Sequence, residues 1–116
     1  MKLVNLTPHP IAIYASGDDW TAEPVAVIAP SGTVARIVDI DLGWGEWPYD
    51  GGSFPITHRE YGRLEGVPPR EEGTQYIVSL VAALAAQGRD DLLAPFGEVR
   101  NDSGTMVGCR ALQRVC

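Results

Sequence analysis

Short apolar or alternating runs, separated by turns rich in glycine and proline, dominate the hydrophobic pattern of this chain. Runs of this length are typical of β-strands rather than of long helices. The predicted strands cover residues 3–6, 11–15, 25–28, 33–40, 54–59, 61–65, 74–78, 98–100 and 105–113. Because Gly32 can adopt the positive φ of a tight turn, we expect strands 25–28 and 33–40 to pair as a hairpin.

One segment has the pattern of a helix. Ser79 is a favourable N-cap, residues 80–87 are rich in helix formers, and Gly88 is a typical C-terminal stop. Since apolar residues surround most of this helix, we expect it to be largely buried against the sheet. Residues 89–94 are either a second short helix or an extended segment, closed by Pro95. The predicted fold is α+β: a β-rich antiparallel or mixed sheet, or a partial barrel, with one central buried helix.

Residues 41–53 differ in composition from the rest of the chain. They contain Trp44, Trp47 and Tyr49 together with four glycines, one proline and three acidic residues. We predict a loop or flap for this segment. Its aromatic side chains either fold back as a small satellite core or stay exposed for a partner.

The charge balance excludes some partners. The chain has fifteen acidic and nine basic residues, a formal net charge of −6, and Lys2 is its only lysine. A duplex nucleic acid partner is not expected, because phosphate binding draws on clustered Lys and Arg. The planar arginine fork still suits a small ligand that carries a carboxylate or phosphate. At 116 residues the chain has the length of a single domain, residues 1–116.

Cysteine usage and hydropathy suggest the compartment. Cys109 and Cys116 form neither a disulfide framework nor a zinc pattern, so we expect no metal, no cofactor and a reducing cytoplasm. The alternation of residues 105–113 makes Cys109 a core residue. The chain contains no apolar run long enough for a signal peptide or a membrane span, so no membrane partner is predicted.

Three groups of polar residues are candidates for ligand binding. Asn5, Thr7 and His9 lie where a strand enters a turn with two prolines, which would hold their side chains in a fixed geometry. The alternative is that Asn5 and Thr7 satisfy backbone groups of the turn while His9 is exposed. Tyr76 and Ser79 form the second group, because the free amides at a helix start can hold an anion. Alternatively, Ser79 only caps the helix.

The third group is Arg89 and Arg100, which could hold an anion, although Arg89 could equally pair with Asp90 or Asp91. If the aromatic rings of residues 41–53 are exposed, a base could also stack on them. The predicted ligand-binding residues are Asn5, Thr7, His9, Arg36, Trp44, Trp47, Tyr76, Ser79, Arg89 and Arg100. Motifs of common enzyme classes are absent, so no catalytic residue is predicted.

Several motifs together resemble a known family. They are Asn-Leu-Thr-Pro-His-Pro at 5–10, Pro-Ser-Gly-Thr-Val-Ala-Arg at 30–36, Tyr-Gly-Arg-Leu-Glu-Gly-Val-Pro at 61–68, Gly-Thr-Gln-Tyr-Ile-Val-Ser at 73–79 and Arg-Asp-Asp at 89–91. The chain resembles small proteins of bacteriophages, prophages and actinobacterial genomes over nearly its whole length, apart from the Trp-rich segment. The resemblance implies an accessory protein that acts inside a bacterial cell.

Residues and resemblance together lead to three functional hypotheses. The first is a counter-defence protein that sequesters a small anionic ligand, such as a nucleotide immune signal, without catalysis and as a homo-oligomer. The second is an inhibitor that binds a bacterial defence protein through the Trp-rich segment. A small hydrolase is the third hypothesis.

Overall fold

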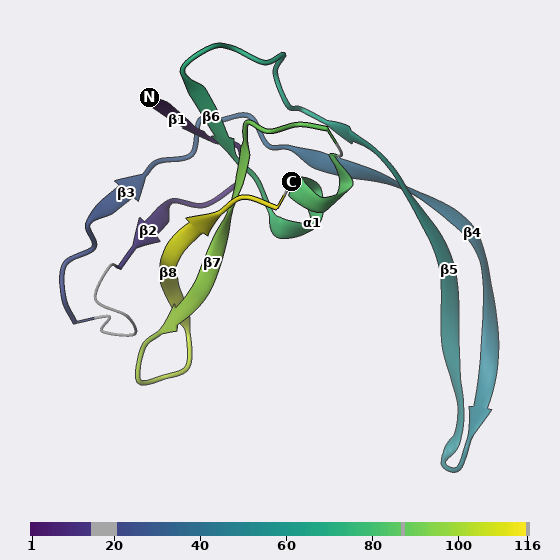
Figure 1. Cartoon of the computed structure of the whole chain (residues 1–116). Coiled ribbons are helices and arrows are strands. Elements are labelled where there is room, and N and C mark those ends of the chain that lie inside the picture. Colours follow the sequence, from purple (N-terminus) through teal and green to yellow (C-terminus); the bar gives the residue numbers. More distant parts are fainter. Residues whose placement is uncertain (15–20, 87, 116) are drawn as a thin grey trace.

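The computed structural model describes residues 1–14, 21–86 and 88–115, which form a six-stranded sheet, one helix and a long two-stranded arm (Figure 1). The elements are β1 (Lys2–Asn5), β2 (Ile11–Ile13), β3 (Ala26–Ile28), β4 (Arg36–Tyr49), β5 (Gly52–Glu65), β6 (Thr74–Ile77), α1 (Leu80–Ala85), β7 (Leu92–Arg100) and β8 (Met106–Gln113). The β-rich fold predicted from the sequence is confirmed, and the sheet is mixed.

The main sheet curves into a nearly closed barrel. Its strand order is β1-β6-β7-β8-β2-β3, with parallel pairs β1–β6, β6–β7 and β2–β8 and antiparallel pairs β7–β8 and β2–β3. A bridge between Asn5 and Pro30 joins the two ends, and the amide of Ser31 donates to the carbonyl of Asn5 at 2.9 Å. The β2–β8 contact is close: a Cβ on Gly108 would lie 2.5 Å from the carbonyl oxygen of Ala12, so only glycine fits there.

The core lies between the sheet and α1. Leu6, Tyr76, Val78, Leu92 and Ala94 are buried together with two helical alanines, Ala82 and Ala83. Tyr76 and Val78 along one strand path, and Leu92 and Ala94 along the next, are alternate residues, as the period of a strand requires. The predicted burial of Cys109 is confirmed, whereas Cys116 lies outside the described residues.

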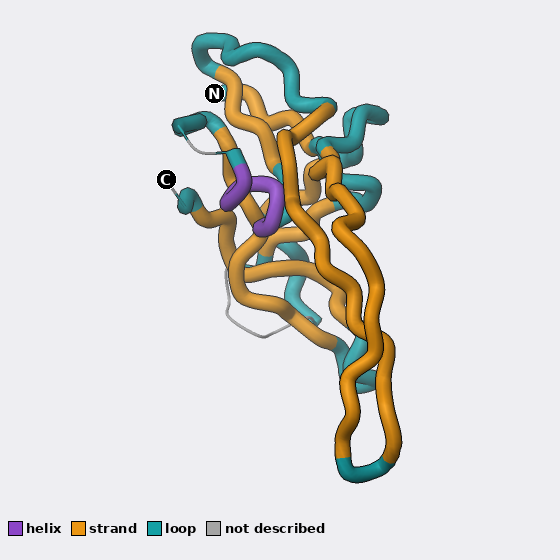
Figure 2. The backbone as a smooth tube through the Cα atoms, turned by 90° about the vertical axis from the view of Figure 1, so that its right-hand side faces the viewer, coloured by secondary structure: helices purple, strands orange, loops and turns teal. Residues whose placement is uncertain are grey.

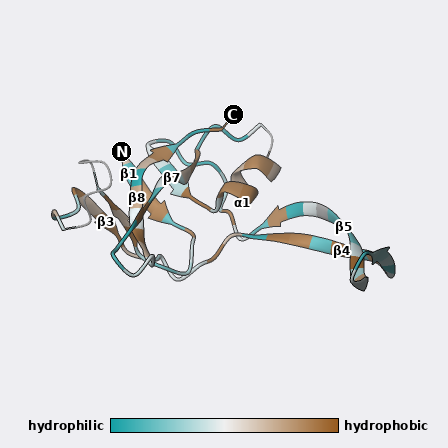
Figure 3. Ribbon diagram, turned by 90° about the horizontal axis from the view of Figure 1, so that it is seen from below, coloured by the Kyte–Doolittle hydropathy of each residue, from teal (hydrophilic) through white to brown (hydrophobic). Residues whose placement is uncertain are grey.

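The helix is shorter and more exposed than predicted. It spans Leu80–Ala85, and Gln87 lies outside the described residues. Leu80, Val81 and Leu84 are all exposed, so the expectation of a central, largely buried helix is wrong. With fewer than two turns, α1 covers β7 and the start of the arm with one side only (Figure 3). A helix of six residues is also far shorter than one that spans a membrane.

The arm, residues 36–65, is the largest difference from the sequence prediction. Residues 33–40 do not pair with 25–28; β4 instead pairs with β5 along its whole length, and residues 41–53 are strand and turn rather than a flap. The arm leaves the body as a ribbon (Figure 2). The radius of gyration is therefore 17.5 Å, against about 13 Å for a compact chain of this length.

β7 also runs further than the sequence suggests. It is extended from Leu92 through Pro95 to Arg100, so the alternative of a short helix over 89–94 is wrong and Pro95 does not end the segment. β6 pairs with β7 only at Leu92 and Leu93. Because the missing N–H of Pro95 therefore costs no bond to β6, the strand tolerates the proline.

Candidate functional site

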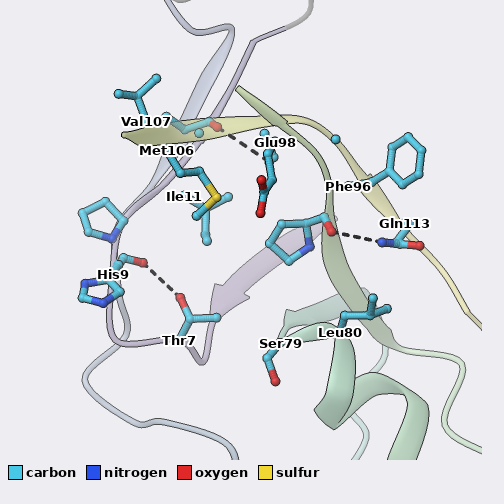
Figure 4. Close-up of a pocket in the computed structure, with 16 residues that line it drawn as sticks. Thr7, His9, Ile11, Ser79, Leu80, Phe96, Glu98, Met106, Val107 and Gln113 are labelled. Atoms are coloured by element: carbon cyan, nitrogen blue, oxygen red, sulfur yellow. Dashed lines mark hydrogen bonds between the residues drawn. The ribbon is translucent and has the colours of Figure 1, made fainter. Parts of the chain in front are cut away.

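A cleft of about 620 Å³ opens between β2, β7, β8 and the start of α1 (Figure 4). Its size is typical of pockets for small molecules. Of the residues predicted to bind a ligand, it brings together Thr7, His9 and Ser79. These residues come from the turn before β2 and from the position before α1, so two of the three predicted groups converge here.

Asn5 supports the cleft rather than lining it. Its side chain is 1% exposed, and its Nδ2 donates to the carbonyls of His9 at 2.8 Å and Ile28 at 3.0 Å. Its Oδ1 accepts from the amide of Thr7 at 2.9 Å. Every polar atom of the Asn5 side chain is used within the fold, so Asn5 holds the turn rather than lining the cleft. The alternative, in which it satisfies backbone groups of the turn, is confirmed.

The hydroxyl groups at the cleft are partly engaged. Thr7 Oγ1 lies 2.6 Å from Asn5 Oδ1 and 3.0 Å from the carbonyl oxygen of His9, and its single hydrogen can donate to only one of them at a time. Ser79 Oγ accepts from the amide of Ala82 at 3.2 Å, which makes Ser79 the N-cap of α1. The hydroxyl hydrogen of Ser79 and a lone pair of Thr7 stay available to a ligand.

The walls of the cleft are mostly apolar. Ile11, Phe96, Met106 and Val107 line it, and the lining includes no Lys or Arg. Its one carboxylate, on Glu98, accepts from the Arg100 guanidinium at 2.5 Å. Arg100 itself does not line the cleft; it also donates to the carbonyl of Gly104 at 2.7 Å. The geometry therefore favours an uncharged ligand over an anion.

Arg89 and Tyr76 form bonds within the fold rather than lining the cleft. Arg89 donates from Nε and Nη2 to the two carboxylate oxygens of Asp91, both at 2.7 Å, and also to the carbonyl of Pro68 at 3.1 Å. These bonds lower the pKa of Asp91 and raise that of Arg89. The hydroxyl of Tyr76, a buried residue, lies 3.4 Å from the carbonyl of Pro69. Neither residue lines the cleft, so the structure does not bring them together with Thr7, His9 and Ser79.

Arg36, Trp44 and Trp47 all lie on the arm. Arg36 begins β4 opposite Glu65, at the base of the arm and outside the cleft lining. The two tryptophans are 66% and 54% exposed, so they do not form the satellite core that the sequence left open. Only two residues separate them along β4, and the register is not shifted between them, so they face opposite sides of the ribbon.

The tip of the arm, residues 41–58, carries most of the exposed aromatic side chains among the residues that the structure describes. Phe54, which the sequence did not single out, lies opposite Trp47 and packs edge-on against Tyr49 with ring centroids 5.7 Å apart. On the other face, Trp44 donates from Nε1 to Asp41 at 3.0 Å. The amide of Gly43 and that indole N–H lower the pKa of Asp41. These contacts orient Trp44, Tyr49 and Phe54, and all three rings stay exposed.

Comparisons of the chain with family models, with curated proteins and with solved structures find no match. The resemblance to phage and prophage proteins therefore stays a prediction from the motifs. Within residues 1–14, 21–86 and 88–115, no group of three or more His, Cys, Asp or Glu side chains could hold a metal ion.

Proposed function

We propose that this protein is a non-enzymatic binding protein that docks onto another protein through its arm. The observation that supports this is the exposure of aromatic side chains on both faces of a two-stranded ribbon. Isolated two-stranded hairpins are marginally stable in water, and long unpaired strand edges tend to acquire partners. Trp and Tyr are also the residues that most often dominate binding energies.

The size of the exposed surface agrees with this function. Trp44, Trp47, Tyr49 and Phe54 are each 41–66% exposed. A buried aromatic side chain covers about 150–250 Å², so these four rings present on the order of 400 Å². The largest contiguous apolar patch on a monomer covers about 300–600 Å² and often has a function; here the apolar surface is divided between the two faces of the ribbon. The surface of the four rings is about half of one side of a standard interface, which buries about 800 Å².

The motif resemblance suggests the setting. An accessory protein of phage type would act in the cytoplasm of a bacterial host, and the target of the arm would be a defence protein of that host. In this view the body of the protein is a rigid base that holds the arm, since Ile37 and Leu64 at the base of the arm pack against the core. The small hydrolase stays a prediction.

Trp47→Ala is expected to abolish binding while leaving the fold intact. Because this indole is half exposed, its loss should cost less than about 1 kcal/mol of stability, but about 2–4 kcal/mol of affinity if it is a binding hot spot. Phe96→Ala is the matched control, since Phe96 is also 54% exposed but lies on β7. A photoreactive phenylalanine analogue at position 54 would crosslink the partner in host lysate, and the purified partner would give the affinities.

Two results would contradict this proposal. One is a loss of about 3–5 kcal/mol of stability in Trp47→Ala, which would make the indole a core residue. The other is equal crosslinking by Trp47→Ala and the parent protein.

A second candidate function is binding of a small molecule in the cleft. The convergence of Thr7, His9 and Ser79 on one apolar cleft favours it. Sequestration of a nucleotide signal, the first hypothesis from the sequence, would take place here. The lining lacks Lys and Arg, however, so the ligand that fits best has an uncharged ring system with hydrogen-bonding groups.

A thermal shift assay tests the cleft. Adenosine should raise the melting temperature of the parent protein more than adenosine monophosphate does, because the cleft lining has no Lys or Arg to bind the phosphate. Met106→Lys places an ammonium group at the exposed Met106 position and should reverse this order. A parent protein that prefers the monophosphate, or a Met106→Lys protein with unchanged preference, would place the ligand outside the cleft.

A further inference from the structure

The tip of the arm carries acidic as well as aromatic side chains. Between residues 41 and 58 there are three acidic residues, Asp41, Glu46 and Asp50, and no Lys or Arg. Asp41 is engaged with Trp44 and Gly43. Glu46 and Asp50 form no hydrogen bond or ion pair within the part of the chain that the structure describes. The tip therefore presents unpaired negative charge directly beside exposed rings.

We infer that the arm tip binds a basic, apolar groove of its partner protein, in which Arg or Lys side chains meet these carboxylates and rings. This inference rests on the proposed function of the arm. Complementary charge steers association and fixes the register of an interface. An arginine guanidinium can also stack on Trp and Tyr rings, which gives it a second favourable contact in the same groove.

The arrangement of the two faces supports this occupant. Trp44 and Glu46 lie on one face of the ribbon, while Trp47, Tyr49 and Phe54 lie on the other. Asp50 lies in the turn that joins the strands. A groove that encloses the tip would therefore contact aromatic rings on both faces of the ribbon. It would also contact the carboxylate of Glu46 on one face and that of Asp50 at the end.

A second copy of this chain fits the tip less well. The arm, residues 36–65, contains six acidic residues and three arginines, a net charge of −3. The whole chain has a net charge of −6, so the rest of it carries −3 as well. Docking of one tip on another copy, either on its arm or on its body, would bring like charges together.

Binding of defined peptides tests the inference on the full-length protein. The probes are three fluorescein-labelled decapeptides in which Val alternates with Arg, Ser or Glu. In 50 mM NaCl the Arg peptide should bind at least about 10-fold more tightly than the Ser peptide, and the Glu peptide should not bind. Raising NaCl to 500 mM should weaken the Arg peptide several-fold, because salt screens exposed charges.

Matched charge variants distinguish the effect of the carboxylates at the tip from the effect of the net negative charge of the whole chain. Glu46→Gln with Asp50→Asn should weaken the Arg peptide about 5- to 10-fold. Glu71→Gln with Glu72→Gln removes the same charge from an exposed loop outside the arm and should change binding less than about twofold. Equal weakening by both pairs, or equal binding of the Arg and Ser peptides, would overturn the inference. If Trp47→Ala still abolished crosslinking in that case, protein binding by the arm would stand and only the basic partner would be wrong.

Discussion

Asn5→Asp should destabilise the protein by about 3–5 kcal/mol, although the two side chains have the same shape. Nδ2 of Asn5 donates to two backbone carbonyls, those of His9 and Ile28. A carboxylate in its place would face two carbonyl oxygens with no donor, inside a site that is 1% exposed. The cost is that of a buried charge without a counter-charge. Urea unfolding at pH 7 measures it directly.

Two further variants check this explanation. Asn5→Ala removes the same bonds without adding a charge and should cost less, about 1–3 kcal/mol. Thr7→Val removes one hydroxyl from the same turn and should cost about 1 kcal/mol. The deficit of Asn5→Asp should shrink as the pH falls toward about 4, because burial raises the folded pKa of that carboxyl above its unfolded value, about 3.9. An Asn5→Asp protein as stable as Asn5→Ala would show that this site is hydrated.

Local patterns predicted the strands and the helix start well. The runs 3–6, 74–78 and 105–113 match β1, β6 and β8 to within one residue at each end. Ser79 was predicted as the N-cap of α1 and is observed there. Such features depend on neighbouring residues, which the sequence displays directly.

The arm was missed because its alternation is interrupted. A register shift between Asp41 and Gly43, and another between Ile37 and Asp39, move the apolar positions from one face of the ribbon to the other. A regular period of two therefore fails just where the strand continues. A signal was present: Asp50-Gly51 joins the two strands as a two-residue turn, and Asp-Gly between strands is a strong hairpin indicator.

The cleft could not be predicted from the sequence. It depends on the parallel pairing of β2 with β8, which joins residues almost a hundred positions apart. Apolar residues such as Phe96 and Met106 carry no local mark of a binding site. The role of Arg89 could not be predicted for a related reason. Its guanidinium can bind an anionic ligand, but only the fold shows that it is already paired with the carboxylate of Asp91.

Arg89→Ala should destabilise the protein by about 3–5 kcal/mol. Asp91 is 3% exposed, and its carboxylate accepts both bonds from Arg89 at 2.7 Å. Without the guanidinium, a buried carboxylate loses its counter-charge. Asp91→Ala should cost less, because the Arg89 side chain it leaves behind is 26% exposed and can reach water. Arg89→Lys should rescue only part of the loss, since an ammonium cannot make the bidentate contact.

The pH dependence gives an independent readout. In the parent protein Arg89 holds the pKa of Asp91 below its usual value. The pair therefore stabilises the fold above the unfolded pKa, about 3.9, and this contribution is lost as the pH falls through the lower, folded pKa. In Arg89→Ala, burial raises the pKa of Asp91 instead. The difference in unfolding free energy between Arg89→Ala and the parent protein should therefore shrink as the pH falls. If Arg89 were instead a free anion-binding residue, as the sequence allowed, Arg89→Ala would be as stable as the parent at every pH. Urea titrations of both proteins at pH 7 and at pH 4 distinguish these two roles of Arg89.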